Sequence, residues 1–91
     1  MKPLHLTLKK KWFDKIASGK KTIEYREVKP YWNTRLVNKQ YTEIHFKNGY
    51  SKSSPFMRIE YKGISKRKVP ELNNKVHYCI ELGKVLGIRN H

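Results

Sequence analysis

The hydrophobic period of this chain changes twice within its first 27 residues, which restricts how this region can fold. Three alternating leucines predict a strand with one buried face, namely Leu4, Leu6 and Leu8. Over residues 9–18 the apolar spacing becomes helical and forms a single stripe, made of Trp12, Phe13, Ile16 and Ala17. Gly19 supplies the left-handed residue that often ends a helix. The sequence therefore predicts a strand, a short helix and a second strand in succession.

The second strand, within residues 19–27, is unusually rich in charge. Alternation places Ile23 and Tyr25 on one face. The other face is polar and contains Thr22, Glu24 and Arg26. Because buried charges without partners are costly, we expect this face to meet water, a partner, or a cleft in which Glu24 and Arg26 pair.

Three further strands are predicted from alternating apolar residues, over residues 42–47, 57–62 and 76–82. Asn48 and Gly49 form a strong signal for a two-residue hairpin turn. The polar residues 50–55 that follow are predicted to be a loop or an irregular edge.

Glycine and basic residues mark the predicted strand end and loop in the rest of the chain. Gly63 and Ile64 are predicted to bend or end their strand, and residues 65–74 read as a basic surface loop. In the short tail, residues 83–91, three apolar residues are expected to return to the core, namely Val85, Leu86 and Ile88. Residues 1–91 therefore predict one small α+β domain. We expect a mostly antiparallel, partly closed β-barrel, because closure protects strand edges.

The charge balance points to a polyanionic partner. The chain has 21 Lys plus Arg against 7 Asp plus Glu, a net charge of +14, and a pI near 10.1. Such an excess favours RNA, DNA or an acidic surface, and the alternative is a solvated basic shell that serves solubility.

Several classes of protein are disfavoured. No apolar run has the length of a signal peptide or a membrane span. The lone Cys79 excludes an internal disulfide and is typical of a buried strand residue in a reducing compartment. Four histidines and this cysteine show no metal-ligand spacing. We therefore expect a cytoplasmic protein with no metal, no cofactor and no membrane partner.

Three lysines begin the predicted helix, namely Lys9, Lys10 and Lys11. The helix dipole disfavours cations there by roughly 0.3–1 kcal/mol each when exposed. Either solvation makes this tolerable, or an anion such as phosphate binds there.

Residues 28–36 bring aromatic and basic side chains together. Pro30 can start a short helical turn or fix a loop. Tyr31 and Trp32 form either a packed corner or a surface on which a base stacks, with Arg35 on the nucleic-acid backbone.

The segment after the helix carries a specific pattern. Gly19, Lys21, Glu24 and Arg26 occupy the four fixed positions of G-x-K-x-x-E-x-R. The chain in this respect resembles the ASCH domain family, and the order of the later strands also fits. The resemblance implies a barrel of the PUA-like superfold, with the helix beside it and the signature residues lining a cleft between barrel and helix.

The resemblance also implies functions. ASCH domains are generally regarded as RNA-binding or nucleic-acid-associated modules, and small members include an amidohydrolase of N4-acetylcytidine and a proposed ribonuclease. The amidohydrolase branch uses a lysine, a threonine three residues later and a distant glutamate. Lys21 matches the lysine, but Glu24 stands at the threonine position and Thr22 is only one residue away. Three glutamates are candidates for the distant one, namely Glu60, Glu71 and Glu81.

Two main hypotheses follow. In the first, the chain binds nucleic acid, with RNA favoured, through Lys9, Lys10, Lys11, Lys20, Lys21, Arg26, Tyr31, Trp32 and Arg35. In the second, it is a small hydrolase acting on RNA or on a nucleoside-like small molecule. Lys21 would then be a base or nucleophile, Glu24 a general acid or base, and Arg26 a stabiliser of negative charge. The same trio is also an ordinary way to satisfy charges at a barrel mouth. A third hypothesis is an adaptor that docks on an acidic protein.

Overall fold

The computed structural model describes residues 2–90, in which one five-stranded sheet is accompanied by two α-helices. The elements along the chain are β1 (Leu4–Thr7), α1 (Lys10–Ala17), β2 (Ile23–Glu27), α2 (Pro30–Leu36), β3 (Glu43–Lys47), β4 (Phe56–Val69), the 3₁₀-helix η1 (Pro70–Leu72) and β5 (Lys75–Arg89). The strand order is β1-β3-β4-β5-β2. β1 runs parallel to β3, and every other neighbouring pair is antiparallel.

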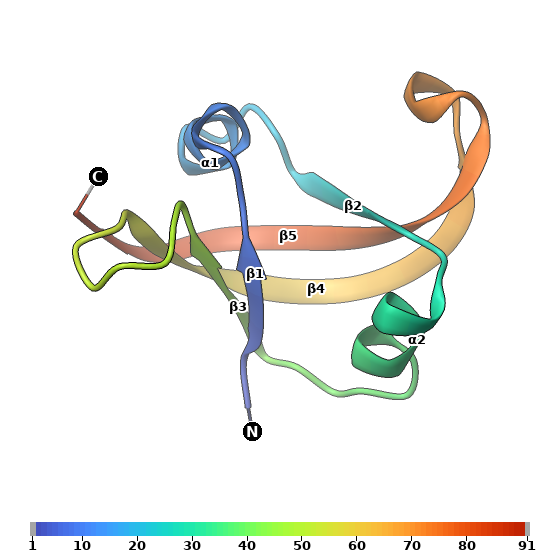
Figure 1. Ribbon diagram of the computed structural model, residues 1–91, viewed down its shortest axis with the longest axis horizontal. Helices are drawn as coiled ribbons and strands as arrows, with labels where there is room; N and C mark the ends of the chain where they lie inside the picture. The colour runs from blue at the N-terminus through green and yellow to red at the C-terminus, as the bar shows by residue number, and fades with distance from the viewer. Residues whose placement is uncertain (1, 91) are drawn as a thin grey trace.

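The sheet curls into a half-barrel because its two long central strands bend (Figure 1). The pairing of β4 with β5 shifts register between Arg58 and Gly63, and such bulges increase bend and twist. Gly63 has a φ of +131°, a conformation that other residues rarely adopt. The edge strands β1 and β2 are not paired with one another. The predicted α+β class and the partly closed, mostly antiparallel sheet are confirmed.

The core lies on the concave face of the sheet, between strands and helices. Its fully buried side chains include Phe13, Ile16, Leu36, Ile44, Phe46, Met57 and Ile80. Phe13 and Ile16 anchor α1, which ends at Ala17 and is followed by Gly19 in the predicted left-handed conformation (φ +81°). Trp12, predicted to belong to this buried stripe, is 39% exposed. The helix buries only the Phe13 and Ile16 side of the stripe, so the larger indole is left at its edge.

The turn between β3 and β4 is not the predicted two-residue hairpin. Residues 48–55 form the connection, closed by a hydrogen bond from the Asn48 N–H to the Pro55 carbonyl (2.9 Å). The Asn48 side-chain amide donates to the Leu8 carbonyl (2.9 Å) and so ties the loop to the end of β1. The predicted irregularity of residues 50–55 is confirmed.

The prediction of a basic loop over residues 65–74 is wrong for residues 65–69, which belong to β4. β4 continues to Val69 and pairs with β5, with Lys66 opposite Tyr78 and Lys68 opposite Val76. Only η1 and a turn with Asn73 in the left-handed region separate the two strands. In the β4 half of this two-stranded ribbon, Lys66, Arg67 and Lys68 place charge on both faces, so this part of the sequence lacks the alternation of a half-buried strand.

The C-terminal tail continues β5 to Arg89. Val85 packs against the core, as predicted, but Leu86 and Ile88 remain 44% and 39% exposed. The lone Cys79 is fully buried on β5, which confirms the burial predicted for it. No helix within residues 2–90 is long and apolar enough to cross a membrane.

Candidate functional site

A cleft of about 790 Å³ opens between α1, the edge strand β2 and the tip of the β4–β5 ribbon. The N-terminal side of the cleft consists of Thr7, Leu8, Lys9, Trp12 and Lys15. Its floor consists of Lys21, Glu24, Tyr25, Arg26 and Glu27, and its remaining walls of Trp32, Glu71, Leu72 and His77. The volume lies within the usual range for small-molecule sites.

A buried carboxylate forms the centre of this cleft. Glu24 is only 5% exposed. Its Oε2 lies 2.9 Å from Nη2 of Arg26, and its Oε1 lies 3.6 Å from Nζ of Lys21. Antiparallel pairing of Glu24 with the buried Ile80 directs the carboxylate to the core side of the sheet. Of the three settings expected for this strand face, the structure shows the one in which Glu24 and Arg26 pair in a cleft.

Arg26 has hydrogen-bonding capacity left over. Its Nη2 also reaches the carbonyl of Thr7 (3.4 Å), so the guanidinium bridges the two edge strands. Its Nε is buried and has no hydrogen-bond partner among residues 2–90. A buried donor without a partner is costly in a folded protein. Because this Nε is itself buried, a ligand in the cleft contacts the accessible remainder of Arg26, whose side chain is 20% exposed.

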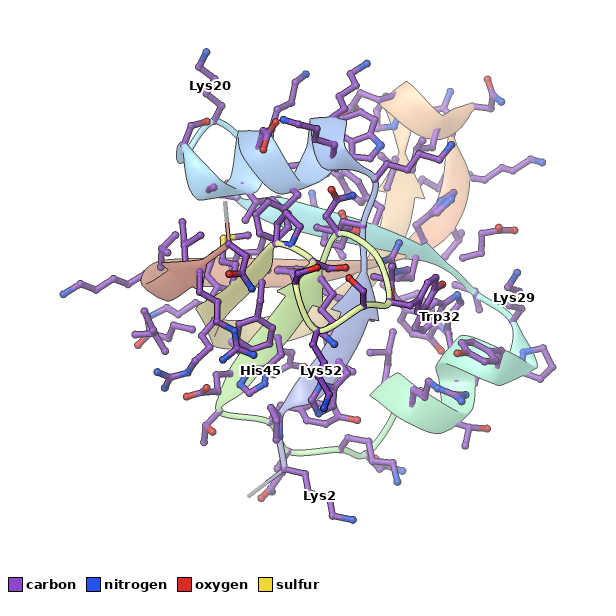
Figure 2. All side chains as sticks on the ribbon, turned by 60° about the vertical axis from the view of Figure 1, so that its left-hand side comes forward. Lys2, Lys20, Lys29, Trp32, His45 and Lys52 are labelled. Carbon is purple, nitrogen blue, oxygen red and sulfur yellow. The ribbon has the colours of Figure 1, made fainter. Side chains whose placement is uncertain are left out.

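Aromatic rings cover the cations of the cleft. The Arg26 guanidinium lies 5.1 Å from the ring of Trp32, a residue of α2 (Figure 2). The Lys21 ammonium lies 4.8 Å from the ring of Tyr25 and 5.3 Å from that of Trp12. Lys15 also lies 5.3 Å from Trp12. Such contacts attract a cation to a ring face.

The structure brings together only part of the predicted nucleic-acid-binding set. Lys9, Lys21, Arg26 and Trp32 line the cleft, as does Glu24 of the predicted catalytic trio. The other five predicted binding residues lie outside its lining, namely Lys10, Lys11, Lys20, Tyr31 and Arg35.

Each of those outer residues has a different setting. Lys10 pairs with Asp14 of its own helix (2.6 Å). Lys11 lies 4.9 Å from the Trp12 ring. Lys20 points away from the body of the protein (Figure 2). Tyr31 and Arg35 stack on one another, with the guanidinium carbon 3.6 Å from the ring centre.

Of the three candidate distant glutamates, Glu71 lines the cleft. Glu60 pairs with Lys62 (3.8 Å) and accepts a hydrogen bond from the Lys84 N–H (3.4 Å). Glu81 is exposed, opposite Ile23. Burial, and secondly the charge of Glu71, raise the pKa of Tyr25 above its usual value of 10.0.

Sequence reasoning missed eight other residues of the cleft: Thr7, Leu8, Trp12, Lys15, Tyr25, Glu27, Leu72 and His77. A tryptophan among lysines on a short helix was a usable signal for Trp12 and Lys15. Nothing local pointed to His77. Within residues 2–90, no cluster of His, Cys, Asp or Glu is arranged to hold a metal ion.

Comparisons of the chain with known protein families, with characterised proteins and with solved structures find no match. Function must therefore be inferred from the geometry and charge of the cleft.

Proposed function

We propose that the chain is an RNA-binding domain of the ASCH type, built on a PUA-like barrel, whose cleft takes one nucleotide of a single strand. The observation that carries this proposal is the set of contacts made by the Arg26 guanidinium. This group is fixed by Glu24, lies beside the Trp32 ring and keeps a buried Nε without a partner within residues 2–90. A held guanidinium beside an aromatic ring offers a fork for a phosphate or base edge and a surface for stacking.

The shape and charge of the cleft support the same proposal. A volume of about 790 Å³ suits a nucleotide and is too small for a duplex. Lys9, Lys15 and Lys21 line it together with Arg26. The net charge of +14 adds a long-range attraction for polyanions.

A titration of labelled single-stranded RNA tests the proposal. We expect affinity to fall with salt, with a log–log slope of roughly −0.7 for each phosphate neutralised. Trp32→Phe should keep most of the affinity and Trp32→Ala should lose about tenfold, since stacking on an aromatic ring is worth roughly 1–3 kcal/mol per base. Tyr50→Ala is the matched control, because Tyr50 is 88% exposed on the β3–β4 loop. Absence of binding at low salt would refute the proposal.

One observation favours a second candidate function, a hydrolase acting on an acylated nucleoside or on RNA. Glu71 lines the same cleft as Lys21, which gives a lysine and a distant glutamate in one site, as the amidohydrolase branch of ASCH domains implies. Lys21 would act as base or nucleophile, Glu71 or Glu24 would transfer a proton, and Arg26 would stabilise the negative charge that develops.

The hydrolase candidate is tested by incubating the protein with N4-acetylcytidine, with related acylated nucleosides and, separately, with RNA. Turnover that disappears in both Lys21→Ala and Glu71→Gln, with the fold intact, would support it. Turnover that survives both substitutions would exclude these roles.

A further inference from the structure

A row of guanidinium groups and aromatic rings leads from the cleft to the outside of α2. The Arg26 guanidinium lies 5.1 Å from the Trp32 ring, and the Trp32 and Tyr31 rings meet edge to face at 4.7 Å. The Arg35 guanidinium then stacks on Tyr31 at 3.6 Å. The row begins at a buried ion pair and ends at side chains in contact with solvent, since Tyr31 is 53% exposed.

The outer end of this row is held in place by its own helix. Nη1 of Arg35 donates to the Tyr31 carbonyl (3.1 Å), which fixes the guanidinium over the ring. Tyr31 covers one side of the Arg35 guanidinium, and Arg35 is itself an exposed residue. A guanidinium plane backed by an aromatic ring is a surface on which an unpaired RNA base can stack.

The β4–β5 ribbon adds cations on the side of α2 that carries Asn33. The Tyr78 hydroxyl of β5 donates to Oδ1 of Asn33 on α2, which joins the ribbon to the helix. Lys66 lies opposite Tyr78 with its Nζ 5.9 Å from the ring, and Lys68, two residues further along β4, shares that face. Within residues 2–90 neither lysine forms an ion pair, so both charges are available to phosphates.

We propose that Tyr31, Arg35, Lys66 and Lys68, here called the α2 surface, bind the stretch of single-stranded nucleic acid that continues from the nucleotide in the cleft. A base stacks on Arg35, and Lys66 and Lys68, which lie on the Asn33 side of the helix, contact other phosphates of the same strand. The inference rests on the proposed RNA-binding function and adds a direction to it, because the strand leaves the cleft past Trp32 and across α2. A duplex would not fit, since its bases are stacked on one another and cannot reach Arg35.

Dependence on ligand length separates the two proposals. The probes are a labelled dinucleotide and a single-stranded RNA of about eight nucleotides, within the site size of small single-strand-binding folds. The wild type should bind the longer RNA more tightly. Arg35→Ala should weaken the longer RNA by about tenfold and leave the dinucleotide unchanged. Lys39→Ala, an exposed cation just beyond α2, is the matched control.

The two lysines give a second, independent measurement. Replacing Lys66 and Lys68 together by alanine should reduce the salt slope for the longer RNA by about 1.4, at roughly 0.7 per phosphate contact. The slope for the dinucleotide should not change. Lys52→Ala, on the loop between β3 and β4, should leave both slopes as they are. Because these lysines are exposed on the ribbon, their replacement tests the α2 surface even if Arg35→Ala fails to fold.

Each contrary outcome has a distinct meaning. Dinucleotide binding with no gain for the longer RNA, or equal losses at both lengths in Arg35→Ala, would overturn the α2 surface and leave the cleft proposal standing. Failure of the wild type to bind either probe would refute the proposed function, and the inference with it. Polyglutamate that binds as tightly as the longer RNA, and is weakened equally by Arg35→Ala, would assign the surface to an acidic protein instead.

Discussion

Two glutamates in this protein are each held by two basic side chains, and their surroundings differ. Glu43, on the outer side of β3, accepts hydrogen bonds from Nε and Nη2 of Arg58 (2.7 and 3.0 Å) and lies 2.7 Å from Nε2 of His45. Glu24, in the cleft, has one arginine nitrogen at 2.9 Å and the Lys21 ammonium at 3.6 Å. The first cluster is more exposed, with 47% of the Arg58 side chain accessible, whereas Glu24 is 5% exposed.

The two clusters differ in how many hydrogen-bond donors of the arginine are already used by the protein. Arg58 uses both sides of its fork on Glu43, so that cluster is complete without a ligand. Arg26 keeps a buried Nε without a partner within residues 2–90, in a place where burial makes charges costly to hold. An ion pair that is both buried and incomplete points to a binding site, and one that is exposed and saturated points to a structural role.

The largest effect should come from removing the buried charge. Glu24→Gln leaves Lys21 and Arg26 without their carboxylate in a mostly buried site. It should lower the free energy of unfolding by about 3 kcal/mol, measured by urea denaturation at neutral pH. Glu43→Gln should cost less, because its partners reach water. Equal losses for the two variants would show that burial does not distinguish the clusters.

Arg26→Lys keeps the positive charge beside Glu24 but removes the fork. Affinity for single-stranded RNA should fall about tenfold or more, since a hydrogen bond to a charged group is worth roughly 1.5–3 kcal/mol. The matched change Arg58→Lys should leave affinity nearly unchanged, as should Lys52→Ala. Similar losses in all three variants, measured by the same titration, would indicate a diffuse basic surface instead of a site.

Acid should weaken the saturated cluster in a defined range. The hydrogen bonds from Arg58, and then from His45, lower the pKa of Glu43 from 4.5 to about 2. The unfolded chain therefore takes up this proton first, and the stability that the cluster contributes above pH 4.5 is lost as the pH falls towards 2. Unfolding curves of the wild type and Glu43→Gln should converge over that range. Glu60→Gln should not reproduce this convergence.

The smallest predicted effect concerns the wall of the cleft. Burial first, and Glu71 second, raise the pKa of Tyr25 above 10.0. Glu71→Gln removes only the second cause, so the Tyr25 phenol should titrate closer to 10.0 but still above it. Tyrosinate absorbance, taken as the difference from the corresponding Tyr25→Phe protein, measures the shift, and Glu81→Gln is the control. An unchanged titration would place the Glu71 carboxylate away from this ring.

The alternation of residues along one strand was sufficient to predict the part of the site that lies on that strand. Alternation in residues 22–26 put Glu24 and Arg26 on the same side, and the structure pairs them. It could not place Trp12, whose position at the edge of an apolar stripe is compatible with burial or exposure. It also could not choose among Glu60, Glu71 and Glu81, because each glutamate is locally equivalent and only the folded ribbon brings one of them to the cleft.

The sequence by itself determined the α+β class, the first helix with its glycine stop, most of the strands and the charged face of β2. These features depend on hydrophobic period and on single residues such as Gly19, which act over a few positions. Tertiary structure alone decided that β4 and β5 extend into a ribbon, that Glu71 joins the cleft and that Tyr78 of β5 bonds to Asn33 of α2. A polar segment extends as a strand because a partner strand supplies hydrogen bonds, and the sequence of the segment does not indicate which strand that partner is.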